Sequence, residues 1–419
     1  MEQIVIVGAG LAALRSAEHL RELGFDGRIV IVGDEPHRPY HRPALSKQIV
    51  TGELKPADLT FPAYTDLDVR WRLRTPAHGL DIGRRVVELP GGEELPYDGL
   101  IIATGVEARH LSGAPRHDPR VHVLRTIADA EELVGTLRAT KGRVVIVGTG
   151  FTGCELAGSL RELHRDVTLV GRSTTLFGNA LGPELSDSLR ALHQRNGVDL
   201  ALGVTVRTWA PSANGVALVL SDERLLLADC VVLAVGSQPN TRWLAGSGLV
   251  LEDGVLCEAT CHAVGATDVM AAGDVACWPN LRFDGVPRRV EHWLNAIEMG
   301  RAAAANLLAG RGKAEMFTPL PRFWSEQHHV RIQAAGMPSL ADQRLKVDTR
   351  AGGKPESVTV YARGGNTIGV VGLDRPRMVL TLTSQLANTA WPRMRPQDAG
   401  NVFRPAGPQV VQLPVPESA

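Results

Sequence analysis

The stretch QIVIVGAGLAALRSAEHLRELG, residues 3–24, decides the fold, because it joins three segments of different character. An apolar run predicts a buried strand, the two glycines after it predict a tight turn, and apolar residues at helical spacing follow. A second apolar run, IVIVGDE at residues 29–35, ends on Asp34 and Glu35. A strand, a glycine-rich turn, a helix and an acid about 20 positions on form the pattern of a dinucleotide-binding βαβ unit.

Each part of this pattern has a physical reason. Glycine permits the tight turn and brings bare backbone close to a pyrophosphate, while the helix N-terminus faces the anion with unpaired N–H groups. A carboxylate after the second strand accepts hydrogen bonds from ribose hydroxyls. The stretch therefore predicts a site for one dinucleotide.

The chain repeats the pattern at residues 143–172, RVVIVGTGFTGCELAGSLRELHRDVTLVGR. An apolar strand again precedes the glycine-rich turn, here Gly148, Gly150 and Gly153, and a helix-spaced segment and a strand follow. Two dinucleotide folds in one chain imply two dinucleotides. A flavin dinucleotide that stays bound and a nicotinamide dinucleotide that comes and goes form the economical pair.

Three further stretches favour FAD in one of the two sites. LIIATG at residues 100–105 and VVLAVGSQPN at residues 231–240 are apolar strands that end in small-residue turns, as needed where the chain crosses between nucleotide domains. VMAAGDVA at residues 269–276 is a buried type of strand that ends on Asp274. This carboxylate is placed to accept a hydrogen bond from the ribityl chain of a flavin.

With these motifs the sequence resembles the flavoprotein reductases with two dinucleotide domains, and within them the oxygenase-coupled ferredoxin reductases. Four segments carry the resemblance over essentially the whole chain: RPYHRPALSK from residue 38, VLRTIADAEEL from 123, EHWLNA from 291 and RFWSEQHHVRIQAAG from 322. The last two separate this group from relatives of glutathione reductase and lipoamide dehydrogenase. The resemblance implies an FAD enzyme that passes electrons from NADH or NADPH to an iron-sulfur ferredoxin, which serves a cytochrome P450 or a Rieske oxygenase.

Matching these segments position by position implies a set of FAD-binding residues. Gly8, Gly10 and Ala12 would lie against the pyrophosphate, and Asp34 would hold the adenosine ribose. The other positions implied to bind FAD are Arg42, Lys47, Ala77, Thr104, Gly105, Arg125, Asp274, Glu291 and Trp293.

Three residues are implied to be catalytic. Lys47 resembles the lysine whose ammonium stands near flavin N5, where a fixed positive charge favours negative charge arriving on the flavin. Glu155 resembles the glutamate that pairs with this lysine, although a carboxylate on a helix face can also be merely solvated. Trp324 matches the aromatic residue over the side where electrons leave.

The second glycine-rich turn implies the nicotinamide dinucleotide site. An acid normally follows the second strand in a site for NADH, but this chain has Gly171 and then Arg172. A guanidinium suits the 2′-phosphate of NADPH, so we expect NADPH to be accepted at least as well as NADH, although a lone arginine can also point to solvent. The implied NAD(P) contacts are Gly148, Gly150, Phe151, Thr152, Gly153, Arg172 and Gly236.

These assignments predict an α/β protein with two Rossmann-like dinucleotide-binding domains, similar to glutathione reductase, and a small α+β C-terminal domain. Residues 1–108 and 236–318 would form the FAD-binding domain, residues 109–235 the inserted NAD(P)-binding domain, and residues 319–419 the C-terminal reductase domain. In the last part, ESVTVYAR, TIGVVGL and RMVLTLTSQLAN read as strands.

Length and charge narrow the function further. A chain of 419 residues exceeds one typical core, so two or three domains are expected. Lys plus Arg equals Asp plus Glu at 45 each, which gives no warrant for binding nucleic acid or a membrane. The first strand leaves no room for a secretion signal and no apolar run is long enough to span a membrane, so we expect a cytoplasmic protein.

The residue types of metal sites form no strong pattern, and we predict no metal. Cys257 and Cys261 are not spaced as CxxC and lack the second pair of thiols that a zinc site needs. The prolines around His37 and His41 exclude the helix that would place both imidazoles on one face. Another histidine pair, at positions 328 and 329, would point to opposite faces of a strand.

Two other functions fit parts of the pattern. A disulfide or peroxide reductase needs a redox-active thiol beside the flavin, near RPALSK, but no cysteine precedes Cys154. A protein that senses both dinucleotides without turnover would have no use for a pair such as Lys47 and Glu155.

A ferredoxin reductase also needs a docking surface for its partner. Ferredoxins are typically acidic, so a reductase without net charge should offer a local basic patch near the flavin. The resemblance nominates Arg301 for this patch, with Arg288 and Arg289 as further candidates.

Overall fold

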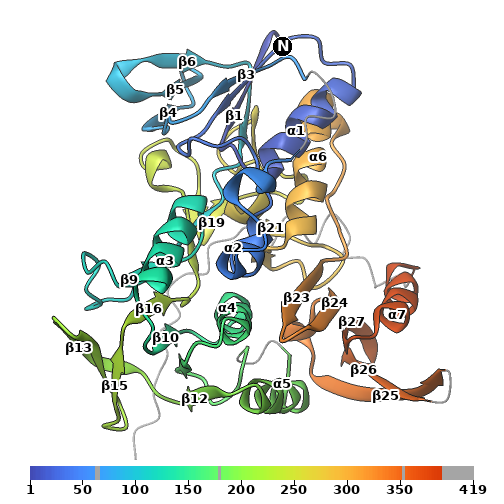
Figure 1. Cartoon of the computed structure of the whole chain (residues 1–419). Helices are drawn as coiled ribbons and strands as arrows, with labels where there is room; N and C mark the ends of the chain where they lie inside the picture. The colour runs from blue at the N-terminus through green and yellow to red at the C-terminus, as the bar shows by residue number, and fades with distance from the viewer. Residues whose placement is uncertain (62–66, 178–180, 352–353, 389–419) are drawn as a thin grey trace, which may run out of the picture.

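In the computed structural model of the chain, the first glycine-rich turn follows the central strand of a five-stranded parallel sheet (Figure 1). The structure describes residues 1–61, 67–177, 181–351 and 354–388. The carboxyl ends of the five strands meet at one edge, because all neighbouring pairs are parallel. In spatial order the strands are β20 (Val269–Ala271), β7 (Gly99–Ile102), β1 (Gln3–Val7), β2 (Arg28–Val32) and β3 (Val69–Arg72).

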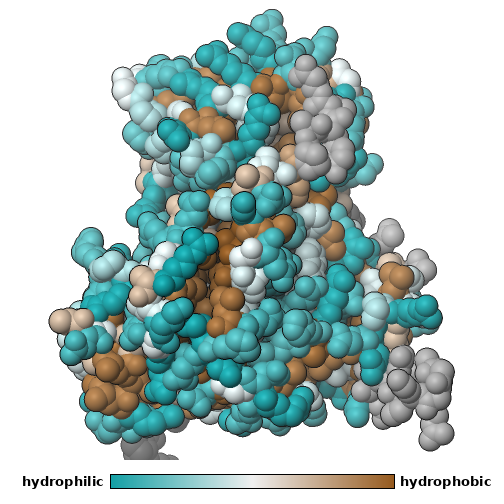
Figure 2. All heavy atoms as spheres, viewed as in Figure 1, coloured by the Kyte–Doolittle hydropathy of each residue, from teal (hydrophilic) through white to brown (hydrophobic). Residues whose placement is uncertain are grey.

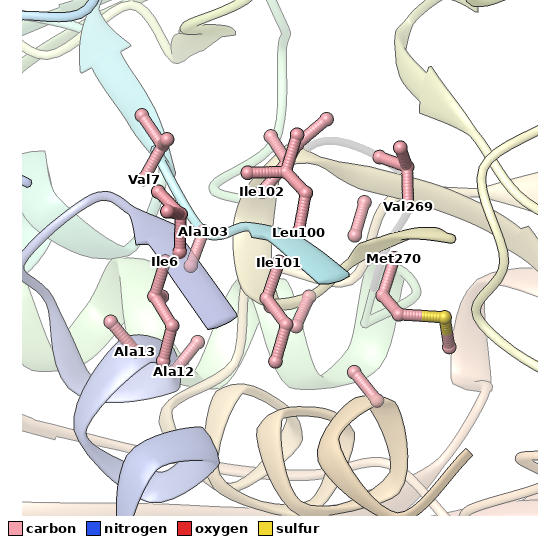
Figure 3. Packing of buried hydrophobic residues seen from close by; sticks show 14 of the residues in the cluster. Ile6, Val7, Ala12, Ala13, Leu100, Ile101, Ile102, Ala103, Val269 and Met270 are labelled. Carbon is pink, nitrogen blue, oxygen red and sulfur yellow. The ribbon is translucent and has the colours of Figure 1, made fainter. Parts of the chain in front are cut away.

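The core of this sheet is a set of apolar side chains in register. Ile101 of β7 stands beside Ile6 of β1 and Met270 of β20, and all three side chains are fully buried (Figure 3). The helices α1 (Leu11–Glu22) and α6 (Trp293–Ala309) pack against each other beside the sheet (Figure 1). The strands β1 and β20 therefore belong to one structural unit, although they are far apart in the sequence.

A second parallel sheet repeats the arrangement around the second glycine-rich turn. The backbone N–H of Gly148 donates to Val170 at 2.8 Å, as that of Gly8 donates to Val32 at 2.7 Å. The strands in spatial order are β12 (Val198–Leu202), β11 (Val167–Gly171), β10 (Val144–Val147), β16 (Cys230–Leu233) and β9 (Val121–Val123). Its helices are α3 (Ile127–Ala139), α4 (Phe151–Glu162) and α5 (Pro183–Arg195). The predicted pair of Rossmann-like folds is confirmed.

Short strands and one short helix, α2 (Gln48–Thr51), complete the first two thirds of the chain. Two three-stranded antiparallel sheets consist of β4 (Gly79–Asp81), β5 (Val86–Glu88) and β6 (Glu94–Pro96), and of β13 (Val206–Ser212), β14 (Gly215–Leu220) and β15 (Leu225–Ala228). The pair β8 (Val106–Ala108) and β17 (Ser237–Pro239) lies where the chain passes between the parallel sheets. Another sheet holds β18 (Leu251–Glu252), β19 (Gly254–Leu256), β21 (Ala276–Pro279) and β22 (Pro287–Arg288).

The C-terminal part is an antiparallel sheet with one helix. ESVTVYAR and TIGVVGL lie in its strands, as predicted. The strand predicted for RMVLTLTSQLAN was wrong, because Pro376–Asn388 is a helix, α7. Thr and Val favour strands, but the helical spacing of Val379, Leu382 and Leu386 places all three in the apolar cluster of this sheet. The strands in spatial order are β23 (Arg322–Gln327), β24 (Val330–Gly336), β27 (Asn366–Leu373), β26 (Lys354–Arg363) and β25 (Gln343–Ala351).

The surface in the space-filling view is mostly hydrophilic, with hydrophobic residues gathered near the centre of this face and over the β13–β15 sheet (Figure 2). On that sheet Leu225 and Leu227 are exposed. Among the described residues, no helix has both the length and the apolar character that crossing a membrane would require. The predicted C-terminal domain continues to residue 419, and its end from residue 389 lies outside the described residues.

Candidate functional site

Both glycine-rich turns open onto one cavity of about 1280 Å³. This volume exceeds the roughly 300 to 1,000 Å³ of a site for one small molecule, so there is room for parts of two dinucleotides. Most of the predicted site residues line it, although they come from all parts of the chain. They are Gly8, Gly10, Ala12, Asp34, Arg42, Lys47, Ala77, Thr104, Gly105, Arg125, Gly150, Phe151, Thr152, Glu155, Gly236, Asp274, Glu291, Trp293 and Trp324.

Gly148, Gly153 and Arg172 are predicted site residues that do not line this cavity. The two glycines serve the backbone instead, since a Cβ on Gly148 would lie 2.0 Å from the carbonyl oxygen of Ala234 and one on Gly153 would lie 2.1 Å from that of Gly148. Gly10 and Gly150 differ, because a Cβ on either would meet nothing within 4 Å. At both turns the backbone of these glycines is open, so a pyrophosphate can approach it closely.

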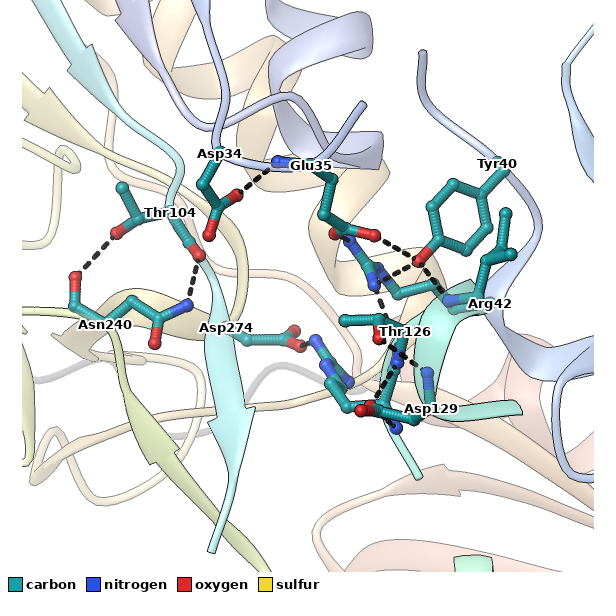
Figure 4. A network of polar contacts seen from close by, with 11 residues as sticks. Asp34, Glu35, Tyr40, Arg42, Thr104, Thr126, Asp129, Asn240 and Asp274 are labelled. Carbon is teal, nitrogen blue, oxygen red and sulfur yellow. Dashed lines mark hydrogen bonds and ion pairs between the residues drawn. The ribbon is translucent and has the colours of Figure 1, made fainter. Parts of the chain in front are cut away.

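The two acids at the end of β2 have different surroundings (Figure 4). Glu35 accepts a hydrogen bond from the Tyr40 hydroxyl at 2.7 Å and forms an ion pair with Arg42. Burial raises the pKa of Tyr40, so its hydroxyl keeps the proton that it donates. Asp34 is exposed and accepts only from the backbone N–H of Glu35 among the described contacts, at 2.9 Å. Asp34 is therefore the acid with free lone pairs for a ribose.

Asp274, in a short 3-10 turn after β20, faces the segment between β9 and α3 of the second parallel-sheet unit (Figure 4). Its carboxylate forms an ion pair with Arg125 at 2.8 Å. Arg125 is held in turn by its backbone, because its N–H donates to Asp129 and its carbonyl accepts from Arg42 at 3.0 Å. The predicted positions 42, 125 and 274 thus form one connected group in the cavity wall.

Several buried donors on residues of the cavity wall have no hydrogen-bond partner within the described part of the chain. They include the Nε of Arg125 and the indole Nε1 of Trp243 and Trp293. Buried N–H groups are normally paired, so unpaired donors in a cavity mark places for a ligand acceptor. Together with the open backbone at both turns, they fit a large polar cofactor such as FAD.

Lys47 and Glu155 meet in the cavity wall as the resemblance implied. Lys47 Nζ lies 2.7 Å from Glu155 Oε2, and the two side chains are only 14% and 11% exposed. The hydroxyl of Ser46 donates to the same carboxylate oxygen at 2.6 Å. Glu155 is therefore not a solvated carboxylate on a helix face. The pair places the Lys47 ammonium in the cavity wall, held by a largely buried carboxylate that also lines the cavity.

Aromatic rings gather beside this pair. Trp293, at the start of α6, meets Trp324 of β23 edge to face, with ring centres 5.7 Å apart. Phe151, at the start of α4, packs on Phe323 with ring centres 4.9 Å apart. Next to Trp293, burial lowers the pKa of His292 to about 4, so this ring is neutral near pH 7. The part of the cavity near the C-terminal sheet is thus apolar.

The end of β11 repeats the end of β2. A Cβ on Gly171 would lie 2.4 Å from the Thr149 methyl group, as one on Gly33 would lie 2.4 Å from the Ala9 methyl group. Arg172 therefore stands at the position that Asp34 takes in the first unit. Arg172 follows at the surface and is exposed. Sequence reasoning placed the missing acid at Gly171, whereas the alignment of IVIVGDE with VTLVGRS, which was the available signal, places it at Arg172.

The five thiols and the histidines at positions 328 and 329 lie outside the cavity wall. All five cysteines are described, buried and free, and none lines the cavity. Burial raises the pKa of the Cys154 thiol well above its usual range, which opposes a reactive thiolate. His328 and His329 lie in the tight turn between β23 and β24 with positive φ, rather than on a strand as assumed from the sequence. Within the described ranges, no three potential metal ligands come together.

The proposed docking arginines differ in exposure. Arg301 is 41% exposed and pairs with Glu22 at 2.6 Å, and Arg288 is 33% exposed and pairs with Asp284 at 2.6 Å. Arg289 is only 9% exposed, because its guanidinium pairs with both Asp253 and Glu291. Its burial removes Arg289 from the candidates for docking, since it presents no charge to a partner.

Comparison with known proteins agrees with this site. Residues 2–300 match the family described as pyridine nucleotide-disulphide oxidoreductase, and residues 322–399 match the one described as reductase C-terminal. The ferredoxin–NAD(+) reductase component of the biphenyl dioxygenase system of Paraburkholderia xenovorans (strain LB400) is 34% identical over 80% of this chain and 81% of its own length. Rhodocoxin reductase of Rhodococcus erythropolis is 31% identical over 89% of this chain and 87% of its own length.

Solved structures show the same likeness over nearly the whole chain. The reductase in the covalent putidaredoxin reductase–putidaredoxin complex superposes with a TM-score of 0.85 at 28% identity, covering 92% of this chain and 93% of that one. Fold, site geometry and sequence similarity thus lead to one conclusion: the chain belongs to the pyridine nucleotide-disulphide oxidoreductase family.

Proposed function

We propose that the chain is a ferredoxin reductase that transfers electrons from NADH or NADPH through bound FAD to an iron-sulfur ferredoxin, which serves a cytochrome P450 or a Rieske oxygenase. The observation that carries this proposal is the single cavity onto which both glycine-rich turns open, with the Lys47–Glu155 ion pair in its wall. The names of the relatives support it, because they are ferredoxin reductase components of oxygenase systems.

In this proposal each of the two parallel sheets belongs to the domain that binds one of the two dinucleotides. Residues 1–108 and 236–318 would bind FAD, since the first sheet takes β20 from the second of these segments. Residues 109–235, around the second sheet, would bind the nicotinamide dinucleotide. Residues 319–419 would form the reductase C-terminal domain, which brings Trp324 to the cavity. A cytoplasmic location remains a prediction from the sequence.

FAD would supply the chemistry, because a flavin accepts two electrons together and releases them one at a time. The chain would bind and orient it. The backbone at Gly8, Gly10 and Ala12 would face the pyrophosphate, and the free carboxylate of Asp34 would accept from the ribose. Lys47 would place its charge where it favours electrons arriving on the flavin ring.

Ferredoxin dependence tests the proposal in steady state. The purified FAD-loaded protein is given NADH or NADPH, cytochrome c as the final acceptor and a panel of iron-sulfur ferredoxins that includes putidaredoxin. We expect cytochrome c to be reduced only when a ferredoxin is present. Turnover with disulfides or peroxides but with no ferredoxin would favour the alternative reductase, and no turnover at all would favour a binding protein.

Docking can be tested at Arg301. Arg301→Glu reverses an exposed charge on α6 and should slow ferredoxin reduction severalfold at low salt, with weaker salt dependence, because rim charges act mainly on association. Reduction of ferricyanide, which needs no docking surface, should be unchanged.

Arg207→Glu is the matched control. Arg207 is also exposed and paired with a glutamate, but it lies on the β13–β14 hairpin, at the other end of the molecule from α6 (Figure 1). It should leave the reduction of both acceptors unchanged. Equal losses with ferredoxin and ferricyanide in Arg301→Glu would mean that this residue acts on the flavin or the fold, and not on docking.

A further inference from the structure

A chain of hydrogen bonds leads from Glu155 away from the cavity. Ser325 Oγ donates to Glu155 Oε1 at 2.8 Å, and Gln327 Nε2 donates to Ser325 Oγ at 3.1 Å. Gln327 Oε1 lies 3.0 Å from His193 Nε2, and His193 Nδ1 lies 2.9 Å from His328 Nε2. Five side chains thus form one continuous chain, which ends on the carboxylate that holds Lys47.

The order of donors in this chain is consistent from end to end. Burial lowers the pKa of His193, and burial with nearby positive charge lowers that of His328 to about 4, so both rings are neutral near pH 7 and carry one N–H each. His328 can then donate to His193, and His193 to Gln327. In each of these hydrogen bonds the donor lies on the side away from Glu155. An ionised carboxylate only accepts, so it is a suitable end for such a series of hydrogen bonds.

The hydrogen-bonded side chains nearest to the ion pair between Lys47 and Glu155 are buried. Ser325, Gln327 and His193 are 0%, 1% and 0% exposed. A buried polar group without a partner costs free energy, so such a chain is tolerated only when every member is satisfied, as here. Turning the Gln327 amide around would bring its Oε1 to Ser325 Oγ, where it would compete with Glu155 for the single proton of that hydroxyl. The carboxylate, which only accepts, therefore favours the arrangement described.

Three separate elements build this arrangement. Ser325 and Gln327 stand two apart on β23, so they share the face that packs on α4. Gly158 of α4 permits the close approach, because a Cβ there would lie 3.1 Å from the backbone nitrogen of His328. The C-terminal sheet thereby reaches the ion pair through a hydroxyl rather than through apolar packing alone.

We propose that Ser325 and Gln327 are positioning residues that fix the Glu155 carboxylate, and through it the Lys47 ammonium, in the cavity wall. The inference rests on the proposed function, in which the charge of Lys47 favours reduction of the flavin. The hydroxyl of Ser46 and Lys47 itself hold one carboxylate oxygen, and Ser325 holds the other. The carboxylate is thus held at both oxygens and cannot rotate away from Lys47. The Gln327 amide orients the hydrogen bonds on both sides of it but does not relay a proton between His193 and Ser325. The role of these hydrogen bonds is therefore to position Glu155.

Ser325→Ala tests this proposal with two readouts on the FAD-loaded protein. The flavin midpoint potential is measured by anaerobic equilibration with a reference dye, and the rate of flavin reduction is measured at saturating dinucleotide. We expect a lower potential and a rate roughly threefold to tenfold slower, with an unchanged Michaelis constant for the dinucleotide, because one neutral hydrogen bond to the carboxylate is lost. Gln327→Met should move both readouts in the same direction by less, and it takes the place of Ser325→Ala if that variant loses its flavin.

Ser186→Ala is the matched control. Ser186 is also a buried serine whose hydroxyl is bonded, but to the backbone of Leu176, so this variant should lower thermal stability and leave the potential unchanged. The decisive comparison adds Ser325→Ala to Lys47→Met. If Ser325 acts through Lys47, the second substitution has no further effect on the potential.

An effect of equal size in both backgrounds would overturn the proposal, as would an unchanged potential in Ser325→Ala with flavin bound. Failure of the proposed function would be seen separately, because the wild-type flavin would then not be reduced by either dinucleotide.

Discussion

Replacing Lys47 with methionine is expected to slow flavin reduction by roughly tenfold to a hundredfold and to lower the flavin potential while FAD stays bound. The substitution removes a charge-assisted contact of 2.7 Å and leaves Glu155, only 11% exposed, as an unpaired negative charge beside the cavity. Negative charge arriving on the flavin would then meet repulsion in place of attraction. Anaerobic stopped-flow measurement of flavin absorbance after mixing with NADH or NADPH gives the rate.

Two further variants separate the charge from other effects. Lys141→Met removes an exposed lysine that does not line the cavity and should leave the rate unchanged. Adding Glu155→Gln to Lys47→Met removes the unpaired carboxylate, so part of the lost rate should return. Unchanged reduction kinetics in Lys47→Met, with intact flavin, would remove Lys47 from the mechanism.

Arg172→Ala is expected to raise the Michaelis constant for NADPH by roughly tenfold to a hundredfold and that for NADH far less. The loss of one charge-assisted contact with a 2′-phosphate sets this magnitude. The wild type should accept NADPH at least as well as NADH, because Arg172 stands where the first unit has the acid Asp34, so the group that would repel a 2′-phosphate is absent there. Such a preference would set the chain apart from relatives that are named for NAD(+). Steady-state kinetics with both dinucleotides measure the ratio.

A reciprocal variant tests the same position. Arg172→Asp introduces an acid at the position that Asp34 takes in the first unit and leaves Gly171 in place, where a Cβ would meet the Thr149 methyl group. This variant should shift preference toward NADH. Arg190→Ala, on α5, is the control for loss of an exposed arginine and should leave the ratio unchanged. A wild type that prefers NADH by about tenfold or more would refute the reading of Gly171 and Arg172.

The glycine-rich turns and their strands could be predicted from the sequence because their requirements are local. Position 148 requires a glycine, because a Cβ there would collide with the carbonyl oxygen of Ala234 at the end of the neighbouring strand β16. This requirement is visible in the residue type and spacing. The meeting of Lys47 and Glu155, 108 residues apart, came only from resemblance to a family, since nothing local in either segment points to the other.

Other features could not be predicted because they depend on packing between distant segments. The bond between Ser325 and Glu155 exists only where β23 meets α4. The burial of Arg289 depends on Asp253, a loop residue far away in sequence. The strand predicted over residues 377–388 failed because residue preference was weighed above helical spacing, which the sheet beneath α7 satisfies.

The central claim is that one cavity joins both cofactors and delivers electrons to a ferredoxin, and single-turnover kinetics test it most directly. FAD-loaded protein is mixed without oxygen with one equivalent of NADH or NADPH and then with an iron-sulfur ferredoxin, while flavin and ferredoxin absorbance are recorded. The account predicts that the flavin bleaches fully and that two equivalents of ferredoxin restore it as they are reduced. A flavin that stays oxidised with both dinucleotides, or a reduced flavin that no ferredoxin reoxidises, would contradict it.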